Sequence, residues 1–226
     1  MTLNLKDKVS YFLITYLFFI LSVGYMVVNY TAKEGTILAN KTWTELQDVF
    51  FTYITHIGDG VVAVFVIFLI FVFSSVRNGL IALFSFTFTA SITQVLKHTL
   101  FSDAMRPFIQ LWDEFKYGDL HLVLPEELMK KGNSFPSGHT TSAFSIFIIL
   151  TLLVKRPALG IVFAIFAALT SYSRVYLGQH FFEDILLGSL IGVFGTLIVY
   201  TIFHKKNYFS NYNYSLLNNI NAKKNI

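Results

Sequence analysis

Residues that can bind or transfer a phosphate group occur in three short runs of an otherwise apolar chain. The runs are Lys97…Arg106-Pro107, Pro136-Ser137-Gly138-His139 and Ser173-Arg174-x5-His180-x3-Asp184. Each lies at or near the end of a long apolar stretch, where ionisable side chains are costly and usually functional. Together they offer fixed positive charge, two imidazoles and a carboxylate that can orient one of them. These are the components of phosphoryl transfer without a metal ion.

His180 and Asp184 are four residues apart, a spacing that places both on one face of a helix. The carboxylate can then accept the N–H of one ring nitrogen and leave the other nitrogen free to attack phosphorus. This arrangement resembles a catalytic triad with His as the nucleophile. Taken alone, such a pair is more often a buried polar contact. Arg174, six residues earlier, favours the catalytic interpretation.

Pro136-Ser137-Gly138-His139 opens a predicted helix. Ser137 is expected to be its N-cap, and a helix N-terminus with small residues can bind an anion. Pro-Ser-Gly alone could equally be a plain capping sequence. His139 favours a site, because an imidazole just inside an apolar helix needs a polar partner, which a phosphate would supply.

Three cations complete the predicted site. Arg106 and Arg174 offer planar forks for two phosphate oxygens, and Lys97 adds a point charge. Three cations this close together would repel one another unless an anion were bound between them. The alternative is that each cation extends to the lipid headgroups. Of the three, Lys97 fits this alternative best.

The composition predicts a membrane protein. Hydrophobic residues make up 54% of the 226 and charged residues 13%, about half the usual charged fraction of soluble domains. We expect an all-α, single-domain bundle over residues 1–226 with a flexible tail from about 208 to 226. Six transmembrane helices are predicted at roughly 11–30, 58–76, 79–101, 137–154, 157–177 and 183–204. Small or hydroxylated residues within the spans are expected at close helix contacts: Ser85, Thr87, Thr89, Gly188 and Gly192.

The distribution of basic residues predicts the orientation. If the N-terminus is cytoplasmic, the cytoplasmic segments hold nine Lys and Arg residues and one acid, Asp7. The remaining eight basic and twelve acidic residues then lie outside, together with every predicted site residue. We therefore predict a multi-pass plasma (inner) membrane protein with both termini cytoplasmic and the site on the outer, periplasmic side. Because the basic residues lie between apolar spans, nucleic acid is not an expected partner.

Two outer segments separate the predicted spans. Residues 31–57 are expected to form an amphipathic helix along the membrane surface, and residues 102–135 a long connection. Among the remaining ionisable residues, His56 and Asp59 are expected only to shape the start of the second span. Nothing in the sequence fixes His121 in place.

The three runs together resemble the type 2 phosphatidic acid phosphatase (PAP2) superfamily, whose motifs are Lys-x6-Arg-Pro, Pro-Ser-Gly-His and Ser-Arg-x5-His-x3-Asp. The second and third motifs match at every stated position. The first departs, because eight residues rather than six separate Lys97 from Arg106. This difference concerns Lys97 more than Arg106, which keeps its Pro107.

The resemblance implies a role for each site residue. His180 would be the nucleophile that forms a phosphohistidine, Asp184 would hold its tautomer, and His139 would protonate the leaving alcohol and then activate water. The phosphoryl oxygens would be bound by Lys97, Arg106, Ser137, Gly138 and Arg174. The resemblance implies no metal ion or other cofactor.

The expected partner is a lipid phosphate in the membrane, such as phosphatidic acid, phosphatidylglycerol phosphate, a polyprenyl diphosphate or lipid A. The sequence does not choose among them, and it does not give an oligomeric state. A phosphatase of soluble phosphate esters remains an alternative with the same fold. A vanadium haloperoxidase is disfavoured by the six spans, and a transporter by the clustering of charges at one face.

Overall fold

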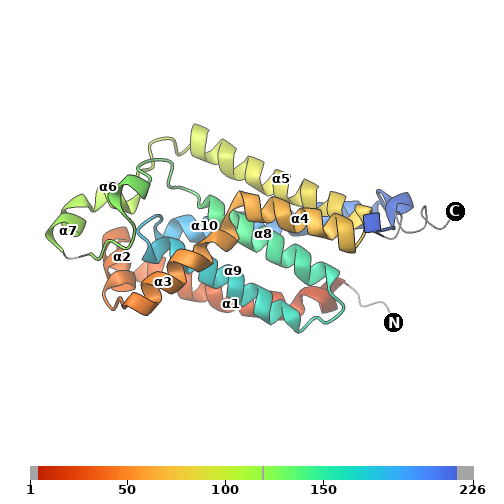
Figure 1. Cartoon of the computed structure of the whole chain (residues 1–226), viewed down its shortest axis with the longest axis horizontal. Helices are drawn as coiled ribbons and strands as arrows, with labels where there is room; N and C mark the ends of the chain where they lie inside the picture. The colour runs from red at the N-terminus through yellow and green to blue at the C-terminus, as the bar shows by residue number, and fades with distance from the viewer. Residues whose placement is uncertain (1–4, 119, 218–226) are drawn as a thin grey trace.

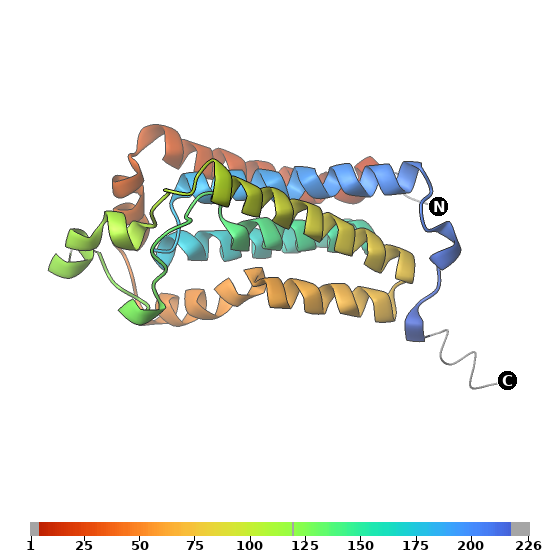
Figure 2. The same cartoon turned by 90° about the horizontal axis from the view of Figure 1, so that it is seen from above.

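The computed structural model describes residues 5–118 and 120–217, which form ten α-helices and three short 3-10 helices and no strand. Six long helices run roughly along one axis (Figures 1 and 2). Their bounds are α1 Leu5–Asn29, α4 Gly60–Phe73, α5 Val76–Thr99, α8 Gly138–Leu153, α9 Leu159–Tyr176 and α10 Phe182–Lys205. Each coincides with one of the six predicted spans. The all-α prediction is therefore confirmed for the described residues.

Four of these helices, α1, α5, α9 and α10, are long and apolar enough to cross a membrane. A fifth crossing is possible if α3 (Glu45–Ile54), η1 (Thr55–Gly58) and α4 count as one span bent by 56°. α8 is apolar but has only 16 residues.

The outer segment predicted as one surface helix instead forms α2 (Ala32–Asn40), α3 and η1. Thr31 and Thr44 cap α2 and α3 with their side chains, which explains two separate starts. Residues 102–135 form α6 (Pro107–Gln110), α7 (Trp112–Tyr117) and η2 (Glu126–Leu128), which lie with α2 and α3 at one end of the bundle (Figure 1).

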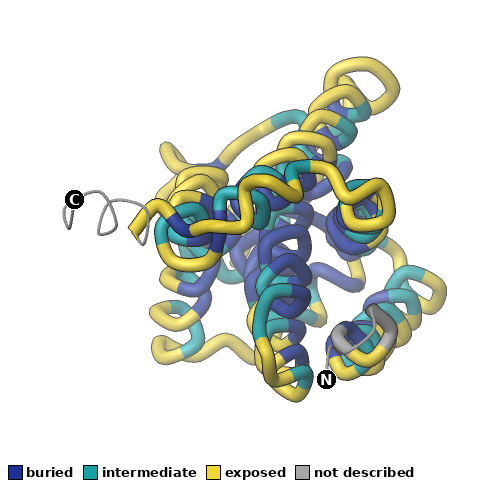
Figure 3. The backbone as a smooth tube through the Cα atoms, turned by 90° about the vertical axis from the view of Figure 1, so that its right-hand side faces the viewer, coloured by how far each residue is buried: buried dark blue, intermediate teal, exposed yellow. Residues whose placement is uncertain are grey.

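The buried core lies along the middle of the bundle and the exposed positions lie around it (Figure 3). α8 packs between α9 and α10, and α10 also contacts α5. At the α8–α10 contact, a Cβ added to Gly188 would lie 2.7 Å from the Ser137 carbonyl oxygen, and one added to Gly192 would lie 2.7 Å from that of Thr141. The prediction that these glycines permit close packing is confirmed. Ser85 and Thr89 are also buried, but Thr87 is exposed, so its predicted packing role is wrong.

α10 ends, and α1 and α5 begin, at the end of the bundle opposite α6 and α7 (Figure 2). The predicted tail contains η3 (Ser210–Tyr212). The Tyr214 carbonyl accepts the Val76 N–H, and the Tyr208 carbonyl accepts a hydrogen bond from Arg77. Residues 218–226 of that tail lie outside the described part of the chain.

Candidate active site

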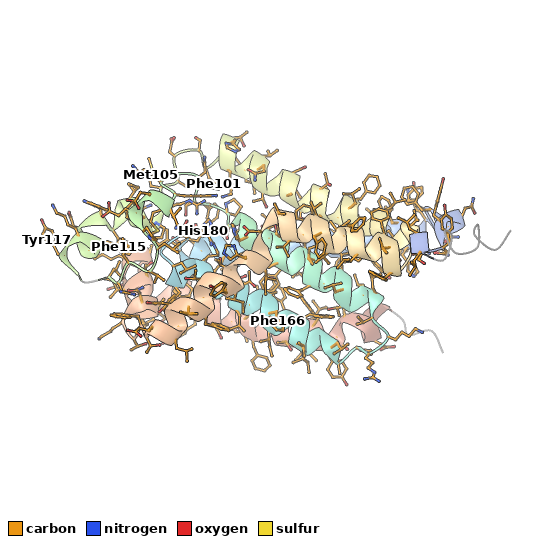
Figure 4. All side chains as sticks on the ribbon, viewed as in Figure 1. Phe101, Met105, Phe115, Tyr117, Phe166 and His180 are labelled. Atoms are coloured by element: carbon orange, nitrogen blue, oxygen red, sulfur yellow. The ribbon has the colours of Figure 1, made fainter. Side chains whose placement is uncertain are left out.

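His180 lies toward the end of the bundle that carries α6 and α7 (Figure 4). The last turns of α5 and α9 meet the first turns of α8 and α10 there. A cavity of about 430 Å³ opens at this place. Five of the eight predicted residues line it: Lys97, Arg106, Gly138, His139 and His180.

His180 follows a tight turn that ends α9. Gly178 adopts a left-handed conformation (φ 65°), which a glycine does without steric cost. The N–H groups of Gln179 and His180 then both donate to the Arg174 carbonyl oxygen, at 2.9 and 3.0 Å. The turn thus fixes how far the His180 ring lies from the last turn of α9.

The contacts of His180 select one tautomer. Its Nδ1 lies 3.0 Å from Asp184 Oδ2, and its Nε2 lies 3.1 Å from Arg106 Nη1. A guanidinium can only donate and a carboxylate accepts. Nδ1 therefore carries the hydrogen, and Nε2 presents its lone pair to the cavity side.

The electrostatic surroundings keep this ring neutral. Burial, and then the nearby charges of Arg106, Arg174 and Lys97, hold the pKa of His180 well below its usual value. A neutral imidazole is the form that can act as a nucleophile.

Asp184 is fixed by three donors to the same carboxylate oxygen. Besides His180, Oδ2 accepts the Phe181 backbone N–H at 2.9 Å and the hydroxyl of Ser134. Ser134 reaches this position because its N–H donates to the Ala104 carbonyl, which pairs the two ends of the 102–135 segment. The carboxylate orients His180 from a position that is itself restrained.

Arg106 is held by backbone carbonyls. Its Nε donates to Gly132 O at 2.9 Å and its Nη1 donates to Gln179 O at 2.8 Å. Its backbone N–H donates to Lys131 O, so both the backbone and the side chain of Arg106 are held in place. The guanidinium lies beside His180 Nε2, and both residues line the cavity.

The structure places Lys97 in the site despite the longer spacing to Arg106. Lys97 is buried in the last turn of α5, and its Nζ donates to Asn133 O at 2.6 Å. The chain leaves α5 after Thr99 and passes through a turn before Arg106. The two additional residues are accommodated there, and both cations line the same cavity.

Ser137, Gly138 and Arg174 differ in their access to the cavity. Ser137 caps α8 by accepting the Thr140 N–H, as predicted, but its side chain is fully buried and does not line the cavity. A Cβ on Gly138 would meet nothing within 4 Å, so the backbone there is open to the cavity. Arg174 lies deeper, donates to Thr55 Oγ1 at 2.6 Å and leaves its buried Nε unpartnered, an arrangement that an anion would satisfy.

His139 is the second residue of α8 and lines the same cavity as His180. Its Nε2 lies 2.7 Å from Asp59 Oδ1. No group of three or more His, Asp or Glu side chains suited to a metal ion occurs among residues 5–118 and 120–217.

The model of the PAP2 superfamily matches residues 78–208, which include all eight predicted site residues. The chain belongs to the PAP2 superfamily. The resemblance inferred from the three motifs is therefore confirmed.

Named PAP2 proteins are similar over different lengths. Lipid A 4'-phosphatase of Bacteroides thetaiotaomicron is 39% identical over 33% of each chain. Phosphatidylglycerophosphatase B of Bacillus subtilis is 30% identical over 71% of this chain and 76% of its own. The crystal structure of Aquifex aeolicus LpxE superposes with a TM-score of 0.64 at 28% identity, covering 74% of this chain and 93% of that one. The match to the lipid A phosphatase spans only about a third of that relative's length.

Two side chains contact Asp184 and His139 without having been predicted to do so, those of Ser134 and Asp59. Ser134 carries no signal in the sequence beyond its place two residues before Pro136. Asp59 was expected only to shape the start of α4, where it is the N-cap without a side-chain capping bond. Its contact with His139 is tertiary, and the sequence pattern does not contain it.

Proposed function

We propose that this chain is a membrane-embedded, metal-independent phosphatase that hydrolyses the phosphomonoester or diphosphate of a lipid through a phosphohistidine intermediate. The observation that carries the proposal is the fixed tautomer of His180. Its Nε2 lone pair points to a cation-lined cavity while Asp184 holds Nδ1–H.

In the first step, Nε2 of His180 attacks phosphorus and the bond from phosphorus to the leaving oxygen breaks. Arg106 moves its hydrogen bond from Nε2 to a phosphoryl oxygen, where Lys97 and the backbone of Gly138 also bind the substrate. These fixed charges stabilise the equatorial oxygens of the transition state. His139 gives its proton to the leaving alcohol.

In the second step, water attacks the phosphohistidine. His139, now neutral, takes a proton from that water, and the P–N bond breaks to release inorganic phosphate. His180 returns to the neutral tautomer that Asp184 favours. One imidazole thus serves as acid and then as base.

A lipid substrate is supported by the shape of the cavity. Its α5 wall continues from Lys97 through Thr93 and Ala90 to Phe86. These residues lie on one face of α5 and span about 16 Å at 1.5 Å per residue. A phosphate bound at Lys97 would leave its apolar part to follow this stripe toward the middle of the bundle.

We further propose that all six long helices cross the membrane, with α8 as a short span enclosed by its neighbours. The basic residues Arg77, Lys155, Arg156 and Lys205 lie at helix ends opposite the site. By the positive-inside rule that end is cytoplasmic, so the cavity opens on the outer, periplasmic side.

The test is phosphate release by the purified protein from phosphatidic acid, phosphatidylglycerol phosphate, a polyprenyl diphosphate, lipid A and a water-soluble phosphate ester. We expect release from at least one lipid, full activity in excess chelator, and none from His180→Ala. Release from the soluble ester alone would favour the alternative substrate class. Loss in chelator that Mg²⁺ restores would contradict the metal-free mechanism.

A further inference from the structure

A second carboxylate, Asp59, lies beside the second imidazole of the site. Its Oδ1 is 2.7 Å from His139 Nε2 and its Oδ2 is 2.9 Å from His56 Nδ1. Asp59 lies before residue 78, where the match to the PAP2 family model begins. The motifs of the family therefore assign it no role.

The backbone is shaped to bring Asp59 to this position. A Cβ added to Gly58 would lie 2.8 Å from the His139 carbonyl oxygen and 3.0 Å from the His139 Cβ. Only glycine allows η1 to approach the first turn of α8 this closely. Asp59 follows directly, at the 56° bend where η1 passes into α4.

The charges around His139 make a carboxylate useful there. The positive charges of Arg174 and Lys130 are close enough to affect its ring, and His180 lines the same cavity. Nearby cations disfavour an imidazolium, whereas an adjacent carboxylate favours it. Asp59 is the anion that acts on His139.

We propose that Asp59 is a positioning residue for His139, which holds the ring at the cavity and stabilises its protonated form. This inference rests on the proposed function, in which His139 passes a ring proton to the leaving oxygen and later recovers one from water. Asp59 would then do for the acid what Asp184 does for the nucleophile.

The experiment compares Asp59→Asn and Asp59→Glu with a matched control, His56→Gln, which alters the other neighbour of Asp59. Rates are measured across pH on an alkyl phosphate and on p-nitrophenyl phosphate, whose leaving group needs little protonation. We expect Asp59→Asn to lower alkyl phosphate turnover about 10- to 100-fold, less than the roughly 10²–10⁴-fold loss typical of removing a general acid. The aryl ester should be much less affected.

The pH profile separates positioning from simple support of the fold. Without the carboxylate the imidazolium loses its partner, so the alkaline limb for Asp59→Asn should move to lower pH. Asp59→Glu should recover part of the rate, and His56→Gln should keep the wild-type profile.

Equal losses on both esters with an unmoved alkaline limb would overturn the proposal, as would wild-type kinetics in Asp59→Asn. A wild-type protein that releases phosphate from neither ester nor from any lipid phosphate would instead defeat the proposed function itself.

Discussion

The two His–carboxylate pairs of the site are built in different ways. His180 and Asp184 belong to one turn at the start of α10, and their side chains are 1% and 3% exposed. His139 and Asp59 come from α8 and from the η1–α4 bend, and their side chains are 23% and 36% exposed. The pair proposed to contain the nucleophile is thus local in sequence and buried, whereas the pair proposed to contain the acid comes from distant segments and is partly exposed.

This difference fits the two tasks that we propose for the histidines. A nucleophile needs one tautomer and no competing proton, which burial and three donors to Asp184 provide. A group that exchanges protons with an alcohol and then with water needs access to both. Substitutions at the two pairs and at their neighbours should therefore have effects of different size.

The largest effect is expected from His180→Ala. Removing the proposed nucleophile should lower turnover by about 10⁴-fold or more, because the P–N bond of the proposed intermediate forms at His180 Nε2. The matched control is His204→Ala, near the far end of α10. Phosphate release is measured at equal protein amounts. Normal rates in His180→Ala would invalidate the nucleophile assignment.

His139→Ala should lose about 10²–10⁴-fold, the usual range for a general acid–base group. The loss should be smaller for p-nitrophenyl phosphate than for an alkyl phosphate in the bond-breaking step. Single-turnover kinetics on both esters provides the measurement. An equal loss of bond breaking on the two esters would assign His139 to phosphate binding rather than to proton transfer.

Ser134→Ala tests the restraint that only the buried pair possesses. Loss of one buried hydrogen bond to Asp184 costs about 1–2 kcal/mol, or roughly tenfold in turnover. Ser102→Ala, an exposed position in the same outer segment, should be silent. Steady-state kinetics on one lipid phosphate distinguishes the two variants. Unchanged turnover in Ser134→Ala would show that Asp184 is oriented without the Ser134 hydroxyl.

The smallest effect is expected in the pH profile. Since the pKa of His180 is held well below its usual value, the ring stays neutral as pH falls below about 6.5. Because His180 must be neutral and His139 protonated, the pH profile of activity should be bell-shaped. Its acid limb should lie below about pH 6.5. Lys97→Met removes one of the cations responsible, so its acid limb should move to higher pH.

This profile is measured as kcat/KM on one substrate for both proteins, which cancels the titration of the phosphate itself. An acid limb that does not move in Lys97→Met would contradict the electrostatic account. A profile that rises steadily from about pH 5 to pH 9 would contradict the paired imidazoles.

The sequence pattern predicted the contact between His180 and Asp184, because a four-residue spacing is itself a helical contact. The six long helices were also predictable, since each is a long apolar run. Ser134 and Asp59 were not, because loop pairing with Ala104 and the close approach at Gly58 are tertiary. At the bend that joins η1 to α4, both elements pack against α8. The hydrophobic periodicity of the sequence does not predict this packing.

The central claim is that phosphate passes through His180 Nε2. The direct measurement is rapid quenching of the wild-type protein during turnover, followed by peptide mass spectrometry under alkaline conditions, which preserve phosphohistidine. The account predicts phosphate on His180 in wild type and none at this position in His180→Ala. Rapid turnover with no phosphorylated peptide, or with phosphate on another residue, would contradict it.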